Sequence, residues 1–238
     1  ATHVTGLVMS AKPLNRAHER LMRLLLERTD LIVVFLTRSY TKEEICFDFR
    51  YKTLMHLIDN YFPKNRIVVV PLEKTYIFGG INEVILDSIV LQNSGCNRFV
   101  MGREHTGLGA YYEKDTMKSI IDTLKGITIK IEISSNFVYC DKCKTLVSAT
   151  TCPHGQHHHI SYHSHSIMEL IRSGLIPPNI LVRKEISAMY LEHLHPKRFK
   201  HLETIYADLV PSYGLIENHS EYDFYIELSK LYQTTSLS

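Results

Sequence analysis

Short apolar runs alternate with amphipathic stretches through the first half of the chain. Four runs have the length of buried strands, and they cover residues 5–9, 31–36, 67–72 and 99–101. Between these runs, apolar residues recur at helical spacing in residues 17–28, 47–61 and 82–92. Strands that alternate with helices of this length are typical of βαβ units. We therefore predict an α/β fold with a mostly parallel, doubly wound, Rossmann-like sheet that binds ligands beyond the carboxyl ends of its strands.

The second half of the chain changes character twice. Residues 127–138 have a β-rich pattern, and a segment rich in cysteine and histidine follows before a helix at residues 166–173. Beyond residue 190 the pattern is amphipathic and helical, with breaks at Pro196 and at a PSYG turn. We therefore predict three parts, an α/β domain, a metal-bearing insertion with its attached subdomain, and a helical tail, over residues 1–126, 127–190 and 191–238.

Composition narrows the class of protein without naming it. The chain has 238 residues, of which 45% are hydrophobic and 22% charged, and its formal net charge is +2. No apolar run approaches the roughly 18 residues that a membrane span needs, and so small a net charge gives no reason to expect nucleic acid. The chain opens with no export signal, and the grouping of its cysteines does not resemble a disulfide framework. We therefore expect a protein of the reducing cytoplasm.

The cysteine-rich segment has the spacing of a metal site. Cys140 and Cys143 are separated by two residues, and Cys152 follows after eight more. Two thiolates spaced in this way can bind one ion from a single turn, and tetrahedral zinc completes its shell with a second pair of ligands. The sequence therefore predicts a zinc site in the insertion.

Six histidines between residues 154 and 165 compete to be the fourth ligand. We favour His157 because it allows a comfortable reach from the third cysteine, while His154 and His159 stay open as alternatives. A site with four protein ligands leaves no position for substrate, so we expect the zinc to be structural. A catalytic metal, with one ligand replaced by water, is the alternative.

A glycine-rich loop, residues 102–112 (GREHTGLGAYY), follows the fourth predicted strand. Gly102 and Gly107 would let the backbone approach a ligand closely, and Arg103 and His105 offer donors to phosphate or ribose oxygens. A tight turn with an exposed arginine is the alternative interpretation. The loop is therefore a candidate nucleotide-binding element.

The segment between the first strand and the first helix, residues 12–21 (KPLNRAHERL), carries a second set of donors. A helix amino terminus favours anions, and Lys12, Arg16 and His18 lie where a triphosphate could bind. A lone histidine at such a place is more often a cap or a surface residue. This segment alone is only suggestive.

Taken together, these segments resemble the catalytic domain of the ATP sulfurylase family, in the HxxH nucleotidylyltransferase group, over roughly residues 6–187. GREHTG resembles the family's GRDHAG, and CDKCKTLVSATTCPHG resembles the zinc-clip segment of bacterial and archaeal members. The resemblance starts at the first strand, so we expect the PUA-like amino-terminal domain of typical members to lie outside this sequence. It implies that sulfate attacks the α-phosphorus of ATP, which gives adenylyl sulfate and pyrophosphate.

The resemblance also implies roles for particular residues. His18 matches the second histidine of HxxH, which holds the phosphates, and the loop from Gly102 cradles the nucleoside. Asn93 matches the start of an NYG stretch that precedes that loop. Asn15 stands where the family has its first histidine, and Lys12 lies beside it, so both are expected near the phosphates.

The sulfate pocket departs from the family pattern. Met9 and Ala11 replace the glutamine and arginine that meet sulfate in QxRNPxHxxH, and Met168 replaces a third anion-binding residue, an arginine. Each charge-assisted contact to an oxyanion contributes about 1.5–3 kcal/mol, so their loss would weaken sulfate capture unless other residues substitute.

Three functions therefore remain open. The first is a sulfate adenylyltransferase that uses ATP with magnesium as substrate. The second is a nucleotidylyltransferase with another small acceptor, because Asp87 stands in place of a family histidine and suits a less anionic partner. The third is a non-catalytic module that binds nucleotide and zinc. In each case the helical tail packs on its own domain or forms a homo-oligomer contact.

Overall fold

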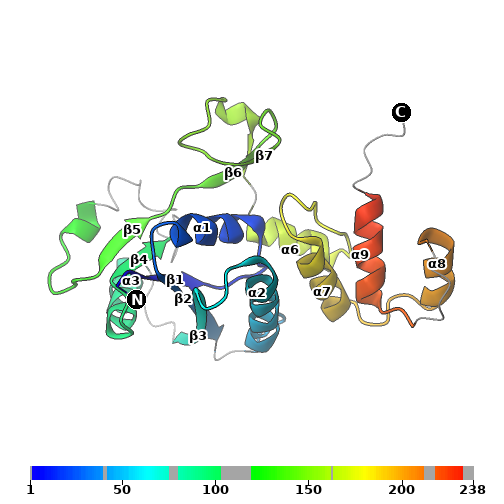
Figure 1. The fold of residues 1–238 in the computed structure, drawn as a ribbon, viewed down its shortest axis with the longest axis horizontal. Coiled ribbons are helices and arrows are strands. Elements are labelled where there is room, and N and C mark those ends of the chain that lie inside the picture. Colours follow the sequence, from blue (N-terminus) through cyan, green and yellow to red (C-terminus); the bar gives the residue numbers. More distant parts are fainter. Residues whose placement is uncertain are drawn as a thin grey trace. The chain divides into compact units, whose positions relative to one another are not determined.

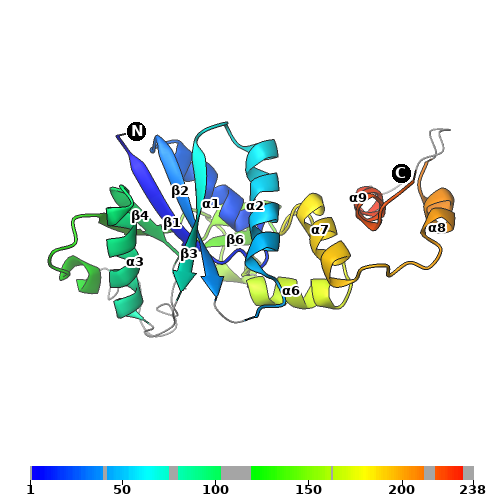
Figure 2. The same ribbon diagram turned by 90° about the horizontal axis from the view of Figure 1, so that it is seen from below.

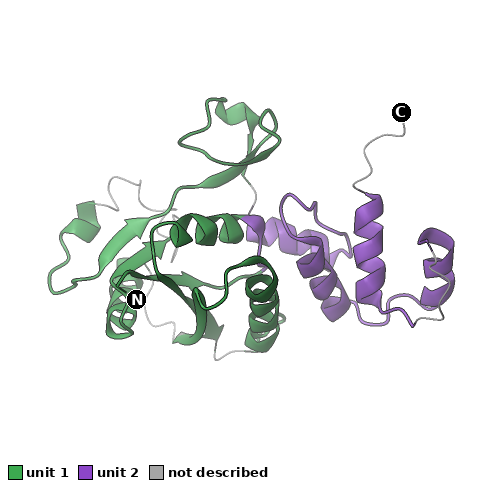
Figure 3. Cartoon of the chain, in the orientation of Figure 1, with its two compact units in different colours: residues 1–12, 17–161 green, residues 13–16, 162–238 purple. Residues whose placement is uncertain are grey.

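The computed structural model describes residues 2–39, 42–74, 80–102, 119–161, 163–211 and 218–232. The chain divides into two compact units (Figure 3). The first comprises residues 1–12 and 17–161, and the second comprises residues 13–16 and 162–238. Among the described residues, no helix is long and apolar enough to cross a membrane.

A five-stranded sheet forms the centre of the first unit, with strand order β3-β2-β1-β4-β5 and parallel pairing throughout (Figure 1). The bounds of its strands are β1 Val4–Met9, β2 Leu31–Ser39, β3 Ile67–Lys74, β4 Arg98–Met101 and β5 Lys130–Ile133. The predicted α/β fold with a mostly parallel, doubly wound sheet is confirmed. Pro71 lies in β3, an edge strand, where its missing N–H costs no ladder hydrogen bond.

Three helices cover the two faces of this sheet. They are α1 (Arg16–Leu26), α2 (Phe47–Tyr61) and α3 (Ile81–Asn93). Right-handed crossovers place α1 and α2 on one face and carry α3 to the other, and Figure 2 shows α2 and α3 on opposite sides of the strands. On the α3 side, Val84 and Leu91 join a buried cluster with Val33 and Phe35 of β2.

The order of the strands reverses between β1 and β4. The chain moves outward from β1 through β2 to β3, then crosses back to place β4 on the other side of β1. Because these neighbours are parallel, the loops that follow Met9 and Met101 open at the same edge of the sheet. This is the place where open α/β sheets bind ligands.

The predicted insertion is divided between two sheets. Residues 130–133 form β5 and extend the central sheet, whereas the cysteine segment forms an antiparallel sheet of its own with order β7-β6-β8. Its elements are β6 Phe137–Cys140, β7 Thr145–Ser148, the short 3-10 helix η2 Gln156–His158, and β8 His159–Ile160. The antiparallel sheet therefore begins at Phe137, about ten residues after the start of the predicted insertion.

The second unit is helical. Its helices are α6 Ser164–Arg172, α7 Lys184–Leu194, α8 Leu202–Leu209 and α9 Glu221–Leu231. α9 packs against α7, and it starts with a capping box in which Ser220 and Asp223 satisfy each other's backbone N–H groups. The boundary that we predicted between residues 190 and 191 falls inside α7, so the helical tail shares an element with the part before it.

Candidate functional site

The three cysteines of the metal motif converge on one histidine. Nδ1 of His154 lies 3.4 Å from the sulfur of Cys140, 3.3 Å from that of Cys143 and 3.5 Å from that of Cys152. The sulfurs of Cys143 and Cys152 are 3.8 Å apart. All four ligand atoms lie within 4.8 Å of one another, so these residues could hold a metal ion.

These distances fit tetrahedral zinc. Zinc–sulfur and zinc–nitrogen bonds of ordinary length put tetrahedral ligands about 3.8 Å apart for two sulfurs and about 3.5 Å apart for sulfur and nitrogen. Four of the six separations between these atoms, 3.3–3.8 Å, follow the same pattern. The set of four protein ligands leaves no open coordination position, which is typical of structural sites.

Local backbone geometry explains how the cysteines meet. Cys140 ends β6 and Cys143 lies in the tight turn to β7, where Lys144 adopts a left-handed φ of 55°. Cys152 and His154 follow β7 and provide the second pair of ligands. A hairpin and the turn after it thus bring two ligand pairs together, which is a common zinc arrangement.

His157 is not part of this group, which corrects the choice of fourth ligand. It belongs to the 3-10 helix η2, and its ring centroid lies 4.1 Å from that of His158. The ring also lies over Gly155, where an added Cβ would come within 2.8 Å of the His157 Cε1 atom. His159, the other alternative, pairs with Cys140 in the sheet and lies outside the ligand group.

The β1–α1 loop, residues 10–15, carries two of the predicted phosphate-binding residues, and His18 follows in the first turn of α1. Lys12 forms an ion pair with Glu43 and keeps 35% of its side chain exposed. Asn15 is buried, and its Nδ2 donates to Oγ of Ser164, 3.3 Å away within the second unit. The ammonium of Lys12 is therefore partly accessible, whereas the amide of Asn15 is buried and already bonded.

Burial lowers the pKa of His18 to about 4. The imidazole is therefore neutral near pH 7, and it would meet a phosphate as a hydrogen-bond donor rather than as a cation. The shift also bears on stability. Because the folded state resists protonation of His18, this residue destabilises the fold progressively as pH falls from about 6.5 to about 4.

Two charged residues near this loop escaped the sequence analysis. Arg50 of α2 is fully buried, and its Nη2 lies 3.0 Å from a carboxylate oxygen of Glu43, which in turn pairs with Lys12. The signal for Arg50 was its position, because it precedes Leu54 and Leu57 at helical spacing and so lies on the buried face of its helix. Nothing in the sequence indicated its acidic partner.

The structure places two of the predicted nucleotide-binding residues at different edges of the sheet, and it does not describe the other three. Gly102 directly follows β4 at the carboxyl edge of the sheet, next to the β1–α1 loop. Arg103, His105 and Gly107 lie outside the described residues. Asn93 is exposed at the carboxyl end of α3, which leads into the amino end of β4, so the structure does not bring it to the same edge as Gly102.

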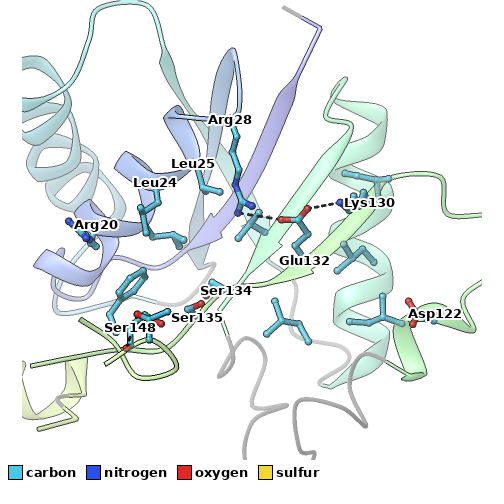
Figure 4. Close-up of a pocket in the computed structure, with 18 of the residues that line it drawn as sticks. Arg20, Leu24, Leu25, Arg28, Asp122, Lys130, Glu132, Ser134, Ser135 and Ser148 are labelled. Atoms are coloured by element: carbon cyan, nitrogen blue, oxygen red, sulfur yellow. Dashed lines mark hydrogen bonds and ion pairs between the residues drawn. The ribbon is translucent and has the colours of Figure 1, made fainter. Parts of the chain in front are cut away.

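A cleft of about 1210 Å³ lies on the α1 side of β4 and β5 (Figure 4). Leu24 of α1 and Ile131 of β5 belong to its apolar lining, and Arg20 and Ser134 to its polar lining. The backbone N–H of Ser134 donates to the carbonyl of Met101, 2.8 Å away. One end of the cleft therefore adjoins the carboxyl edge of the sheet, beside the glycine that follows β4.

The strand order and its reversal between β1 and β4 define an open, doubly wound α/β domain. The sequence profile of the ATP-sulfurylase family matches residues 1–193, and the chain belongs to this family.

Relatives of known name agree with this assignment. The chain is 35% identical over 178 residues to a sulfate adenylyltransferase of Carboxydothermus hydrogenoformans, and 32% identical over 186 residues to one of Halothermothrix orenii. These matches cover 74% and 76% of the chain but only 47% and 48% of the relatives. The chain thus spans about half the length of the curated relatives that it matches.

A solved structure, described as a hexameric APS kinase from Thiobacillus denitrificans, has a similar fold. Its TM-score is 0.58 at 17% identity, over 82% of this chain and 37% of that one. At this identity the similarity concerns the fold alone.

Proposed function

We propose that this chain is the nucleotide-binding, catalytic part of a sulfate adenylyltransferase. In this reaction an oxygen of sulfate attacks the α-phosphorus of ATP, the bond to the β-phosphate oxygen breaks, and adenylyl sulfate and pyrophosphate result. The observation that carries the proposal is the family match over residues 1–193, together with the β1–α1 loop and Gly102 at one edge of the sheet. Such a transfer depends on positioning and charge stabilisation rather than on covalent catalysis.

The phosphates would bind at the start of α1. Besides the partial positive charge at the amino end of this helix, the ammonium of Lys12 and the neutral imidazole of His18 are the groups that we propose to contact them. Asn15, in place of the first histidine of the family motif, would add an amide donor. Magnesium would arrive with ATP and neutralise part of the triphosphate charge.

The nucleoside would bind beside Gly102 at the Ser134 end of the cleft. This end has both apolar walls for a base and hydroxyl groups for a ribose. From the family resemblance, Arg103, His105 and Gly107 would complete the nucleotide loop. Asn93 is not part of this proposal, because it lies at the other end of β4.

Zinc would bind to Cys140, Cys143, Cys152 and His154 and stabilise the small sheet. We assign it a structural role because four protein ligands would leave no coordination position open for substrate. Cysteines grouped at metal-ligand spacing rather than as a disulfide framework are typical of a reducing compartment, which supports a cytoplasmic location. Self-association of this chain stays a prediction.

Isotope exchange between pyrophosphate and ATP tests the function. We expect exchange that requires both sulfate and magnesium, and we expect His18→Gln to slow it about a hundredfold through loss of a phosphate donor. His201→Gln is the matched control, because His201 is exposed and lies in the second unit. Nucleotide binding without exchange at any sulfate concentration would exclude sulfate as the acceptor.

A further inference from the structure

Four hydrogen-bonded groups close a ring around the end of β1. Nη1 of Arg50 donates to the carbonyl oxygen of Ser10, 2.7 Å away, and Nη2 of the same guanidinium binds Glu43 at 3.0 Å. The second oxygen of Glu43 binds the ammonium of Lys12, two residues after Ser10. Arg50 is itself fixed by a bond from its Nε to the carbonyl of Ile45. We call Lys12, Glu43 and Arg50 the loop triad.

The loop triad holds the β1–α1 loop in a fixed conformation. Ala11, between the two bonded residues of the loop, is buried and has a φ of 52°, in the left-handed region that disfavours a side chain. Arg50 is fully buried, so its position is set by packing as well as by its three partners. The carboxylate of Glu43 is therefore held beside Lys12 by contacts within the protein itself.

The carboxylate of the loop triad cancels one of its two positive charges where a ligand would bind. Two cations and one carboxylate leave a net charge of +1, and the carboxylate is shared between both cations. Lys12, with 35% of its side chain exposed, is the more accessible cation, whereas the side chain of Arg50 is 1% exposed. An anion that approaches Lys12 therefore also approaches a fixed negative charge, and like charges placed together disfavour binding.

We propose that Glu43 is a specificity-determining residue that limits how much negative charge the β1–α1 loop can bind. The loop then favours a polyphosphate that arrives partly neutralised by magnesium over a free multivalent anion. This inference rests on the proposed function for its location, because it concerns the same phosphate-binding loop. It adds to that function a preference for a magnesium-bound polyphosphate over a free multivalent anion. Lys12 alone would not give this preference.

Calorimetric titration of the zinc-loaded chain with inorganic pyrophosphate tests this role. We expect Glu43→Gln to bind free pyrophosphate roughly tenfold more tightly than the wild type, because a carboxylate close to the site no longer repels it. With excess magnesium the gain should fall below about threefold, since the ligand then carries less charge. A role of Glu43 in folding alone would not increase affinity.

Matched variants test whether the gain in affinity comes from the charge of Glu43 beside Lys12. Glu73→Gln removes the same charge from another carboxylate paired with an arginine, Arg38 of β2, and should leave affinity unchanged. Glu43→Asp keeps the charge and should bind as the wild type does. Lys12→Met should weaken binding, and in combination with Glu43→Gln it should remove most of the gain.

Three results would overturn the proposal. They are unchanged or weaker binding by Glu43→Gln, an equal gain in Glu73→Gln, and no pyrophosphate binding by any variant. The titration needs no turnover. It therefore stays informative if the wild type fails to exchange pyrophosphate into ATP, so failure of the proposed function and failure of this inference are distinguishable.

Discussion

The position of one imidazole decides the composition of the candidate metal site. His154 lies two residues after Cys152, and its Nδ1 is within 3.5 Å of all three sulfurs. His157 lies only three residues further along but turns its ring over Gly155 instead. Because zinc requires ligand atoms at fixed distances, a histidine in the right segment is not sufficient.

Replacement of single histidines should therefore have unequal effects on zinc. We expect His154→Ala to lose most of its zinc and to destabilise the β6–β8 sheet, because removal of one of four ligands weakens a structural site severely. His157→Ala should retain about one zinc per chain. Metal analysis after dialysis against a weak chelator measures both, and equal zinc loss from the two variants would contradict the assignment of His154.

At this scale, sequence predicts residue types better than partners. The cysteine spacing selected three of the four atoms that the structure brings together, because those thiols lie in a hairpin and its adjoining turn. Which histidine is the fourth ligand depends on the path of the chain after Pro153. The spacing of residues in the sequence does not predict this path. The contact between Glu43 and Arg50 likewise depends on how a loop folds back on its helix.

At the scale of elements, one glycine controls how closely α3 packs on the sheet. A Cβ at Gly6 in β1 would lie 2.4 Å from Cδ2 of Leu91 and 3.2 Å from the sulfur of Cys96. Leu91 is fully buried, so it has little room to move away. The contact sets the spacing between α3 and the strand that leads into the β1–α1 loop.

We expect Gly6→Ala to lower the free energy of unfolding by about 1–3 kcal/mol, because an extra methyl in a well-packed core forces its neighbours to shift. Gly102→Ala is the matched control, since a Cβ there meets no atom of the described residues within 4 Å. Urea unfolding of both variants, followed by circular dichroism, measures the difference. A loss in Gly102→Ala as large as that in Gly6→Ala would show that the crowding at β1 is not the cause.

Elements with a clear hydrophobic periodicity could be predicted from the sequence. The sheet to which each strand belongs could not. The prediction of a helix at residues 47–61 agrees with α2, Phe47–Tyr61, because both its period and its ends are marked in the sequence. The strand β5 was assigned to the insertion, since a β-rich pattern does not reveal which partner a strand pairs with. The partner of β5 is determined by tertiary contacts.

At the scale of the whole chain, the second unit extends past the family match. The match ends at residue 193, inside α7, whereas α9 packs against that helix from beyond the match. Phe224 of α9 is 2% exposed, and its ring meets that of Phe199 at 5.1 Å in an edge-to-face arrangement. We infer that the tail supplies part of the core of the second unit rather than a flexible appendage.

Truncation of this aromatic side chain should therefore weaken the second unit. We expect Phe224→Ala to cost about 3 kcal/mol, because it removes a buried ring and leaves a cavity. Hydrogen exchange measured by mass spectrometry should show faster exchange in α7 and α9, with strands β1 and β2 of the first unit as internal reference. Tyr232→Ala is the control, since Tyr232 is 70% exposed after the end of α9. If α7 exchanges at the wild-type rate in Phe224→Ala, the tail does not stabilise the helix in which the family match ends.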